Sequence, residues 1–138
     1  MSDLRSLLIR HEGLTLKAYL CPAGKITVGV GRNLEDAGIS EAEAMVLLDN
    51  DIERCRVDAA KAFPWFKEMG AARQDVVLSM IFNLGLKGFQ RFSKAIQAIE
   101  AKNYDLAASE LMNSHWAAQV GKRAVDLADM MRTGEYSS

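Results

Sequence analysis

The sequence predicts an α+β protein that is mostly helical, with a small N-terminal β-hairpin lobe and a larger helical lobe. Apolar and polar residues alternate on both sides of a Pro- and Gly-bearing connection between residues 14 and 34, which is typical of a hairpin. Outside that segment, apolar residues recur with the three- and four-residue spacing of helices. Because 138 residues fit one domain, we expect the two lobes to form a single domain over residues 1–138.

Residues 2–11 form the first predicted helix. The leucines of this segment recur with the spacing of a single helix face. Ser2 or Asp3 can cap its start, and Gly13 is a natural stop. We therefore expect the chain to leave helical structure at Gly13 and to enter the hairpin directly afterwards.

The predicted hairpin turns at the run Cys21-Pro22-Ala23-Gly24. Alternating segments precede and follow this run, so both sides are expected to be strands. Gly29 and Gly31 lie in or beside the second strand. Glycine at such positions indicates close approach of the backbone to another group, or a bend.

The rest of the chain is predicted to be helical. Ser40-Glu41-Ala42-Glu43 has the pattern of a capping box, and it opens a helix that should run to about Ala62, before Pro64. A strongly apolar helix follows over residues 71–84, with Gly85 at its end. Further helices are predicted over residues 93–102, 104–112 and 116–131.

Composition and charge exclude several classes of protein. Hydrophobic residues make up 49% and charged residues 25%, which argues against a disordered chain. The net charge of −1 argues against a nucleic-acid partner. No apolar run reaches the roughly 18–20 residues of a membrane span, and charged residues interrupt the N-terminal segment where a secretory signal would be apolar. The two cysteines and two histidines suggest neither a disulfide framework nor a metal site, and we expect no cofactor.

Glu12 is the first candidate for chemistry, because it closes the first predicted helix. The negative end of the helix dipole disfavours ionisation there and raises the proton affinity of the carboxyl. A carboxyl that stays protonated near neutral pH is what a general acid requires. The alternative interpretation is an ordinary solvated glutamate at a helix end.

Cys21 and Thr27 follow at the predicted hairpin. Cys21 is either a small unreactive side chain or, because the turn exposes it, a reactive thiol. Thr27 on its own is typical of a strand. A catalytic pair of Cys21 with His11 is disfavoured, because His11 and Glu12 are adjacent at a helix end and point in different directions. By themselves these residue types identify no reaction.

Taken together, these residues resemble the opening of the phage-type lysozymes, the endolysins of glycoside hydrolase family 24. The family signature is Glu, eight residues, Asp or Cys, five residues and Thr, and it reads here as Glu12, Cys21 and Thr27. Further matches run to the end of the chain. They are Asp51, the run Ile81-Phe82-Asn83-Leu84-Gly85, Trp116, the block Gly121-Lys122-Arg123-Ala124-Val125-Asp126, and the tail Arg132-Thr133-Gly134.

The resemblance implies a lysozyme-like fold with a cleft between the lobes. It implies hydrolysis of the β-1,4 bond between N-acetylmuramic acid and N-acetylglucosamine in peptidoglycan. Glu12 would protonate the leaving oxygen, and Thr27 would hold the attacking water in a reaction that inverts the anomeric centre. Cys21 would fill the second catalytic position.

Gly31, Phe82 and Arg123 are expected to bind the substrate. Phe82 is interpreted mainly as a core residue that can also touch the glycan. The resemblance places Arg123 near the catalytic acid across the cleft, where its charge would favour the ionised form of Glu12 and oppose the helix-end effect.

The sequence departs from many family members at two places. Cys21 replaces an aspartate, and a thiol is only a few per cent ionised near pH 7, so it is a poorer fixed negative charge. We interpret Cys21 first as a group that positions water or acts as a base, and second as a nucleophile. Arg32 replaces a common histidine, and we expect it to pair with Asp51. The short segment after Gly31 predicts a reduced β lobe.

These inferences predict a muramidase used for host-cell lysis. Its partner would be the glycan strands of peptidoglycan, with no nucleic acid and no stable membrane insertion, and we expect a monomer. Lacking a signal peptide, the protein would be made in the cytoplasm and would reach the wall after release through a holin pore. The alternatives are a catalytically weak or inactive peptidoglycan-binding or structural relative, and an unrelated helical interaction module.

Overall fold

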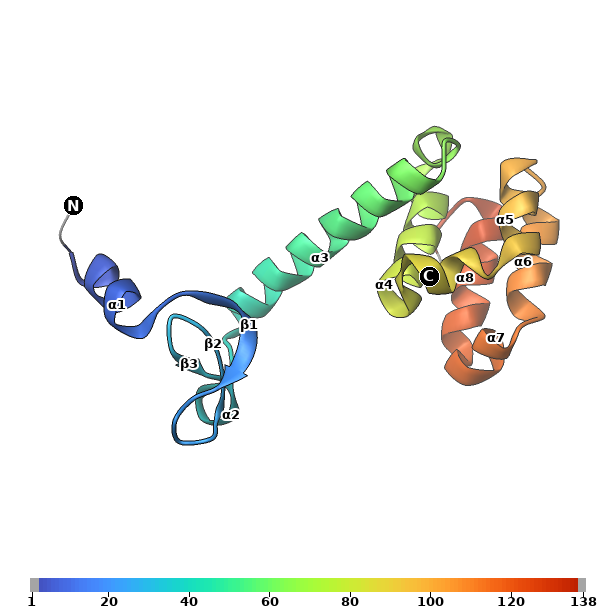
Figure 1. Cartoon of the computed structure of the whole chain (residues 1–138). Helices are drawn as coiled ribbons and strands as arrows, with labels where there is room; N and C mark the ends of the chain where they lie inside the picture. Colours follow the sequence, from blue (N-terminus) through green and yellow to red (C-terminus); the bar gives the residue numbers. More distant parts are fainter. Residues whose placement is uncertain (1–2, 137–138) are drawn as a thin grey trace. The chain divides into compact units, whose positions relative to one another are not determined.

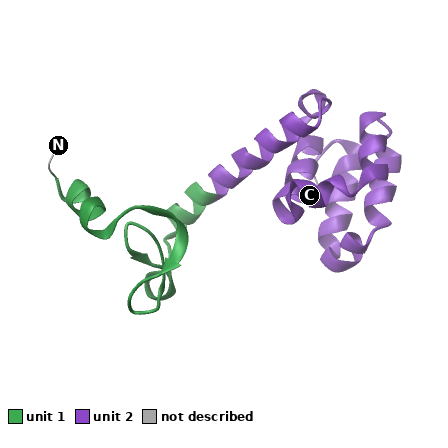
Figure 2. Cartoon of the chain, in the orientation of Figure 1, with its two compact units in different colours: residues 1–47 green, residues 48–138 purple. Residues whose placement is uncertain are grey.

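The structure is a computed structural model that describes residues 3–136. The chain divides into two compact units, residues 1–47 and residues 48–138 (Figure 2). The smaller unit holds the β-structure and the larger unit is helical (Figure 1). The α+β composition predicted from the sequence is therefore confirmed.

The smaller unit begins with helix α1, Leu4–Glu12. The carboxylate of Asp3 accepts a hydrogen bond from the N–H of Ser6 at 2.8 Å, which makes Asp3 the cap. The alternative cap, Ser2, lies outside the described residues. Gly13, with φ of 79°, ends the helix as expected.

Three short strands form an antiparallel sheet in the order β1-β2-β3. Their bounds are Thr15–Leu20, Ile26–Gly29 and Arg32–Asn33. The predicted turn forms at Cys21–Gly24, where the N–H of Gly24 donates to the Cys21 carbonyl at 2.8 Å. Gly24 takes a positive φ of 78°, which suits the last residue of a three-residue hairpin connection.

Two helices follow the sheet. The first belongs to the smaller unit, and the second begins there and continues into the larger unit. Helix α2, Leu34–Ala37, is a single turn that the sequence analysis did not anticipate. Helix α3, Glu41–Ala62, begins with the predicted capping box. The N–H of Glu43 donates to Ser40 Oγ at 3.1 Å, and the N–H of Ser40 donates to Glu43 Oε1 at 2.9 Å. The helix ends at Ala62, also as predicted.

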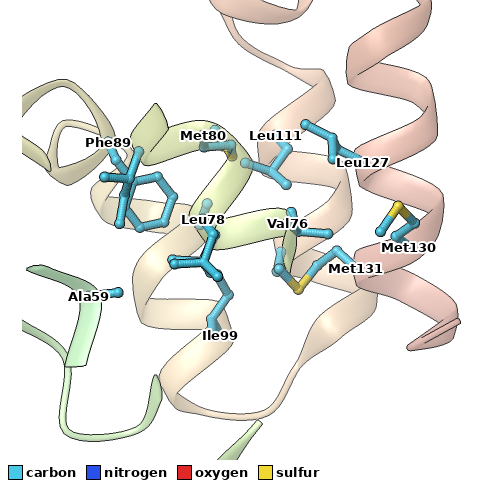
Figure 3. Packing of buried hydrophobic residues seen from close by; sticks show 14 of the residues in the cluster. Ala59, Val76, Leu78, Met80, Phe89, Ile99, Leu111, Leu127, Met130 and Met131 are labelled. Carbon is cyan, nitrogen blue, oxygen red and sulfur yellow. The ribbon is translucent and has the colours of Figure 1, made fainter. Parts of the chain in front are cut away.

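The larger unit packs its helices around an apolar core (Figure 3). Helix α4, Ala71–Gln90, supplies many of the buried side chains, and Gly85, with φ of 76°, breaks its helical conformation where a stop was predicted. A 3₁₀ turn at Phe66–Glu68 precedes it. The remaining helices are α5 (Ser93–Glu100), α6 (Tyr104–Met112), α7 (His115–Val120) and α8 (Lys122–Thr133).

The prediction of one helix over residues 116–131 is wrong. The structure has two helices, α7 and α8, which meet at Gly121. Gly121 takes φ of 59° and ψ of −120°, a conformation outside the helical region that glycine reaches without steric cost. Apolar residues recur on both sides of Gly121, so the periodicity alone did not reveal the break. Among the described residues, no helix is both long enough and apolar enough to cross a membrane.

Candidate active site

Glu12 and Gly31 come into close contact in the smaller unit. Glu12 is the last residue of α1, and Gly31 lies between β2 and β3. A β-carbon on Gly31 would lie only 3.1 Å from Glu12 Oε2, so the carboxyl group rests against the bare backbone of the glycine. The close backbone approach predicted for this glycine pair is confirmed at Gly31. At Gly29, no atom lies within 4 Å of an added β-carbon.

Thr27 occupies the centre of the sheet. It pairs with Tyr19 of β1 on one side and with Asn33 of β3 on the other, and it is only 3% exposed. Its hydroxyl donates to the carbonyl of Lys25 at 2.9 Å. The hydroxyl has one hydrogen, and it lies close both to this carbonyl and to the Cys21 sulfur.

Cys21 lies at the start of the turn that β1 and β2 share, and its side chain is partly buried. Its pKa is lowered, mainly because the backbone N–H of Lys25 bonds to the sulfur, with further contributions from the N–H of Ala23 and the Thr27 hydroxyl. Partial desolvation opposes this effect. Cys21 and Thr27 are therefore neighbours, and the thiol ionises more readily than an ordinary cysteine.

Charged residues from α2 tie this helix to the hairpin. Glu35 Oε1 accepts a hydrogen bond from the backbone N–H of Ile26 at 2.8 Å. The ammonium group of Lys25 lies 3.6 Å from Asp36 and 4.0 Å from Glu35. The sequence did not indicate these contacts, because no helix was expected over residues 34–37.

Arg32 has a partner within its own unit, and the expected ion pair with Asp51 of the other unit stays a prediction. Arg32 makes a two-pronged salt bridge with Glu43, with distances of 2.9 Å from Nη1 to Oε1 and 2.8 Å from Nη2 to Oε2. Arg32 Nη1 also donates to the carbonyl of Gly38 at 3.1 Å. Within the larger unit, Asp51 pairs with Arg54, one turn further along α3. The bond from Arg32 lowers the pKa of Glu43 to about 2, and the capping contacts with Ser40 add to the effect.

The larger unit brings two other predicted residues together. Phe82 and Arg123 line one hollow of about 360 Å³ between α3, α4 and α8. Arg123 Nη2 donates to the carbonyl of Ser79 at 3.3 Å and to its hydroxyl at 3.2 Å. Phe82 is 49% exposed, so the interpretation of Phe82 as mainly a core residue is wrong. The sequence analysis did not anticipate Ser79 as the residue that holds Arg123.

Trp116 is anchored rather than exposed. Its indole Nε1 donates to Asn83 Oδ1 at 3.1 Å, and its ring meets Phe92 edge to face at 5.9 Å between centroids. Two segments of the family resemblance, the run that contains Asn83 and the one that begins with Trp116, are therefore joined in space. This contact links α4 to α7.

A larger hollow of about 660 Å³ lies on the helical unit, where the end of α4 approaches α5 and α7. Its lining mixes cationic, acidic and aromatic side chains, including Arg91, Lys94, Glu110 and His115. None of the predicted site residues lines this hollow. Among residues 3–136, no three His, Cys, Asp or Glu side chains come together to hold a metal ion.

The predicted site residues thus form two described groups. The smaller unit brings Glu12 to Gly31 and Cys21 to Thr27, and the larger unit brings Phe82 to Arg123. The predicted approach of Arg123 to Glu12 stays a prediction. A hairpin lobe that presents a glutamate, a thiol and a threonine, followed by a helical unit with an exposed arginine and phenylalanine, is the arrangement expected of a lysozyme-like hydrolase.

Comparison with known proteins agrees with this class. The family model described as phage lysozyme matches residues 9–132. An endolysin of Acyrthosiphon pisum secondary endosymbiont phage 1 is 32% identical over 121 residues, covering 85% of this chain and 80% of its own length. Probable T4-type lysozyme 2 of Dictyostelium discoideum is 22% identical over 163 residues, covering 97% of this chain and 96% of its own length. The pre-baseplate central spike protein Gp5 of Enterobacteria phage T4 is 23% identical, but its matching part is 28% of that protein.

The chain belongs to the phage lysozyme family, and it is a lysozyme-type hydrolase. The alternative of an unrelated helical interaction module is thereby excluded. The alignment with the Dictyostelium protein extends over 163 positions, more than the 138 residues of this chain, so that relative contains segments that this chain lacks.

Proposed function

We propose that this protein is a muramidase that hydrolyses the β-1,4 bond between N-acetylmuramic acid and N-acetylglucosamine in peptidoglycan. The observation that carries the proposal is the set Glu12, Cys21 and Thr27 on one small β unit, with the carboxyl of Glu12 resting against Gly31. The family membership of the chain supports the same chemistry.

Glu12 is the general acid of the proposed reaction. It donates its proton to the glycosidic oxygen as the bond from that oxygen to the anomeric carbon breaks. Its place at the last residue of α1 supports this role, because it brings the carboxyl against Gly31, next to the strands that carry Thr27 and follow Cys21. No other group within residues 3–47 donates a hydrogen bond to the Glu12 carboxyl in the structure, so the carboxyl is available to the substrate.

Thr27 and Cys21 hold and activate the attacking water. The Thr27 oxygen accepts one hydrogen of this water through a lone pair, which a hydroxyl keeps while it donates its own hydrogen. The Cys21 sulfur accepts the other hydrogen and takes it as the water oxygen bonds to the anomeric carbon. The lowered pKa of Cys21 supports this role, because more of the thiol is ionised than in an ordinary cysteine. Solvent then restores the proton on Glu12 and removes the proton from Cys21.

Phe82 and Arg123 contribute to the same reaction from the helical unit. The exposed ring of Phe82 offers an apolar surface for a sugar face, and Arg123 offers a fixed positive charge beside it. Our proposal is that they bind the glycan and that Arg123 approaches Glu12 in the cleft. The protein would act as a monomer in host-cell lysis, with a holin pore as its route to the wall.

The test is the loss of turbidity of outer-membrane-permeabilised bacteria on addition of the wild-type protein or of Glu12→Gln. We expect the variant to be slower by at least about 10²-fold, which is the usual effect of losing a general acid. Glu100→Gln is the matched control, because it makes the same change at an exposed position at the end of α5. Equal lysis by wild type and Glu12→Gln would eliminate Glu12 as the acid. Binding to purified wall without lysis by either protein would indicate the inactive, peptidoglycan-binding alternative.

A further inference from the structure

Gly31 and its neighbour Gly29 share a backbone conformation but not the contact with Glu12. Both residues take a positive φ, 69° at Gly31 and 70° at Gly29, so both positions resist a side chain for the same backbone reason. At Gly29, no atom lies within 4 Å of an added β-carbon. At Gly31, Glu12 Oε2 lies at 3.1 Å, and Glu12 Cβ and Cδ lie at 3.5 Å. A positive φ favours glycine at both residues, and residue 31 adds the contact with Glu12.

The contact involves the whole length of the Glu12 side chain. Three of its atoms lie along Gly31, from the β-carbon to a carboxylate oxygen. Glu12 is also the last residue before the chain leaves α1, and its carboxyl accepts no hydrogen bond from another group within residues 3–47 in the structure. Packing against Gly31 therefore restricts where the carboxyl can lie.

We infer that Gly31 is a positioning residue for Glu12, because its missing side chain leaves the space in which the catalytic carboxyl lies. This inference deepens the proposed function and rests on it. It also replaces the expectation that Gly31 acts by binding the substrate. The glycine sets the position of the proton donor and need not touch the glycan at all.

A methyl group at residue 31 costs the fold little beyond its backbone strain. A contact of 3.1 Å is shorter than the ordinary 3.4–4 Å, so the carboxyl has to move by a few tenths of an ångström. An exposed side chain can make that movement easily. The reaction is less tolerant, because a general acid has to lie within about 2.6–3.2 Å of the oxygen that it protonates. Since a misplacement of about 1 Å can cost about 10²-fold in rate, we expect a loss of about tenfold in kcat.

The experiment compares Gly31→Ala with Gly29→Ala in the full chain. Both variants place a methyl group on a backbone with positive φ, so both melting temperatures should fall. With soluble glycan fragments of peptidoglycan as substrate, kcat should fall only in Gly31→Ala, and KM should stay unchanged. Unchanged kcat with a raised KM would instead make Gly31 a substrate contact and would overturn the inference. Equal kcat values for the two alanine variants would overturn it as well.

A second measurement does not depend on activity. The carboxyl carbon signal of Glu12 in a ¹³C NMR spectrum is assigned by its disappearance in Glu12→Gln. We expect this signal to move in Gly31→Ala and to stay in place in Gly29→Ala, because only the first variant places a methyl group against the carboxyl. An unmoved signal in both variants would refute the contact. If the wild-type chain proves inactive, the proposed function fails, and this comparison alone decides whether Gly31 positions Glu12.

Discussion

Replacing Thr27 by valine tests whether the hydroxyl of this buried residue acts in catalysis or only in folding. Valine has nearly the same shape as threonine, so the change removes one oxygen from the centre of the sheet and leaves a methyl group. Thr27 is 3% exposed, and its hydroxyl donates to the Lys25 carbonyl at 2.9 Å. A purely structural role and a catalytic role predict different results for this substitution.

The cost to stability is small, because the Lys25 carbonyl keeps a second donor. The backbone N–H of Cys21 also donates to it, at 3.0 Å, so the variant leaves no buried acceptor without a partner. Losing one hydrogen bond of this kind costs about 1 kcal/mol, and burial of the added methyl group offsets part of that. A loss of about 1 kcal/mol corresponds to a fall of about 4 °C in melting temperature for a domain of this size.

The cost to activity is expected to be far larger. Without the hydroxyl oxygen, the attacking water loses one of the two groups that hold it in the proposed mechanism. We expect the rate of peptidoglycan hydrolysis to fall by about 10²-fold, as when a positioned polar group is removed from an active site. Thr27→Ser keeps the hydroxyl and should retain most of the activity.

The assay is turbidity loss beside thermal unfolding, with Thr15→Val as the control. Thr15 is an exposed residue of the same sheet, and its hydroxyl donates to the carbonyl of Gly29 at 3.4 Å, so the control makes the same chemical change outside the proposed mechanism. Full activity in Thr27→Val would refute the role of the hydroxyl. A loss of stability above about 3 kcal/mol would show that the hydrogen-bond account of Lys25 is wrong.

The remaining predictions concern charge and the thiol. Arg32 lowers the pKa of Glu43 from its ordinary 4.5 to about 2, so the stabilisation is complete above pH 4.5 and is lost as the pH falls through about 2. The melting temperature of wild type should exceed that of Glu43→Gln at pH 6, and the two should converge towards pH 2; a constant difference would contradict the pairing. The pKa of Cys21 is lowered, whereas burial raises the pKa of Cys55. Iodoacetamide at pH 7 should therefore label Cys21 first, which peptide mapping can show. Lysis should fall as the labelling of Cys21 proceeds. Cys21→Asp should stay active and Cys21→Ala should be impaired, whereas full labelling of Cys21 without loss of activity would make the thiol a bystander.

Local signals in the sequence predicted much of the fold. The cap at Asp3, the turn at Cys21–Gly24 and the capping box at Ser40 each depend on residues within a few positions of one another, and each forms as expected. The glycine at residue 31 was also informative. Its presence beside a strand indicated a close backbone approach, although the sequence did not say that Glu12 was the group that approached.

Other features of the structure could not be predicted, because they depend on contacts or backbone conformations that the local sequence pattern does not reveal. The salt bridge from Arg32 to Glu43 could not be predicted from the pattern, because Glu43 was expected only as part of the capping box. The break at Gly121 was hidden because apolar residues recur on both sides of it. Phe82 lies on α4 among apolar residues that are largely buried. The sequence pattern therefore did not show that the Phe82 ring is exposed.

The most direct test of the central claim is the identity of the sugar released at the new reducing end. Purified cell-wall glycan is digested with wild type and with Glu12→Gln, the products are reduced with borohydride, and the reduced sugar is identified by mass spectrometry. We predict reduced N-acetylmuramic acid from the wild-type protein and at least about 10²-fold less of it from the variant. Reduced N-acetylglucosamine as the product, or equal release by both proteins, would contradict cleavage of the muramyl bond by a proton from Glu12.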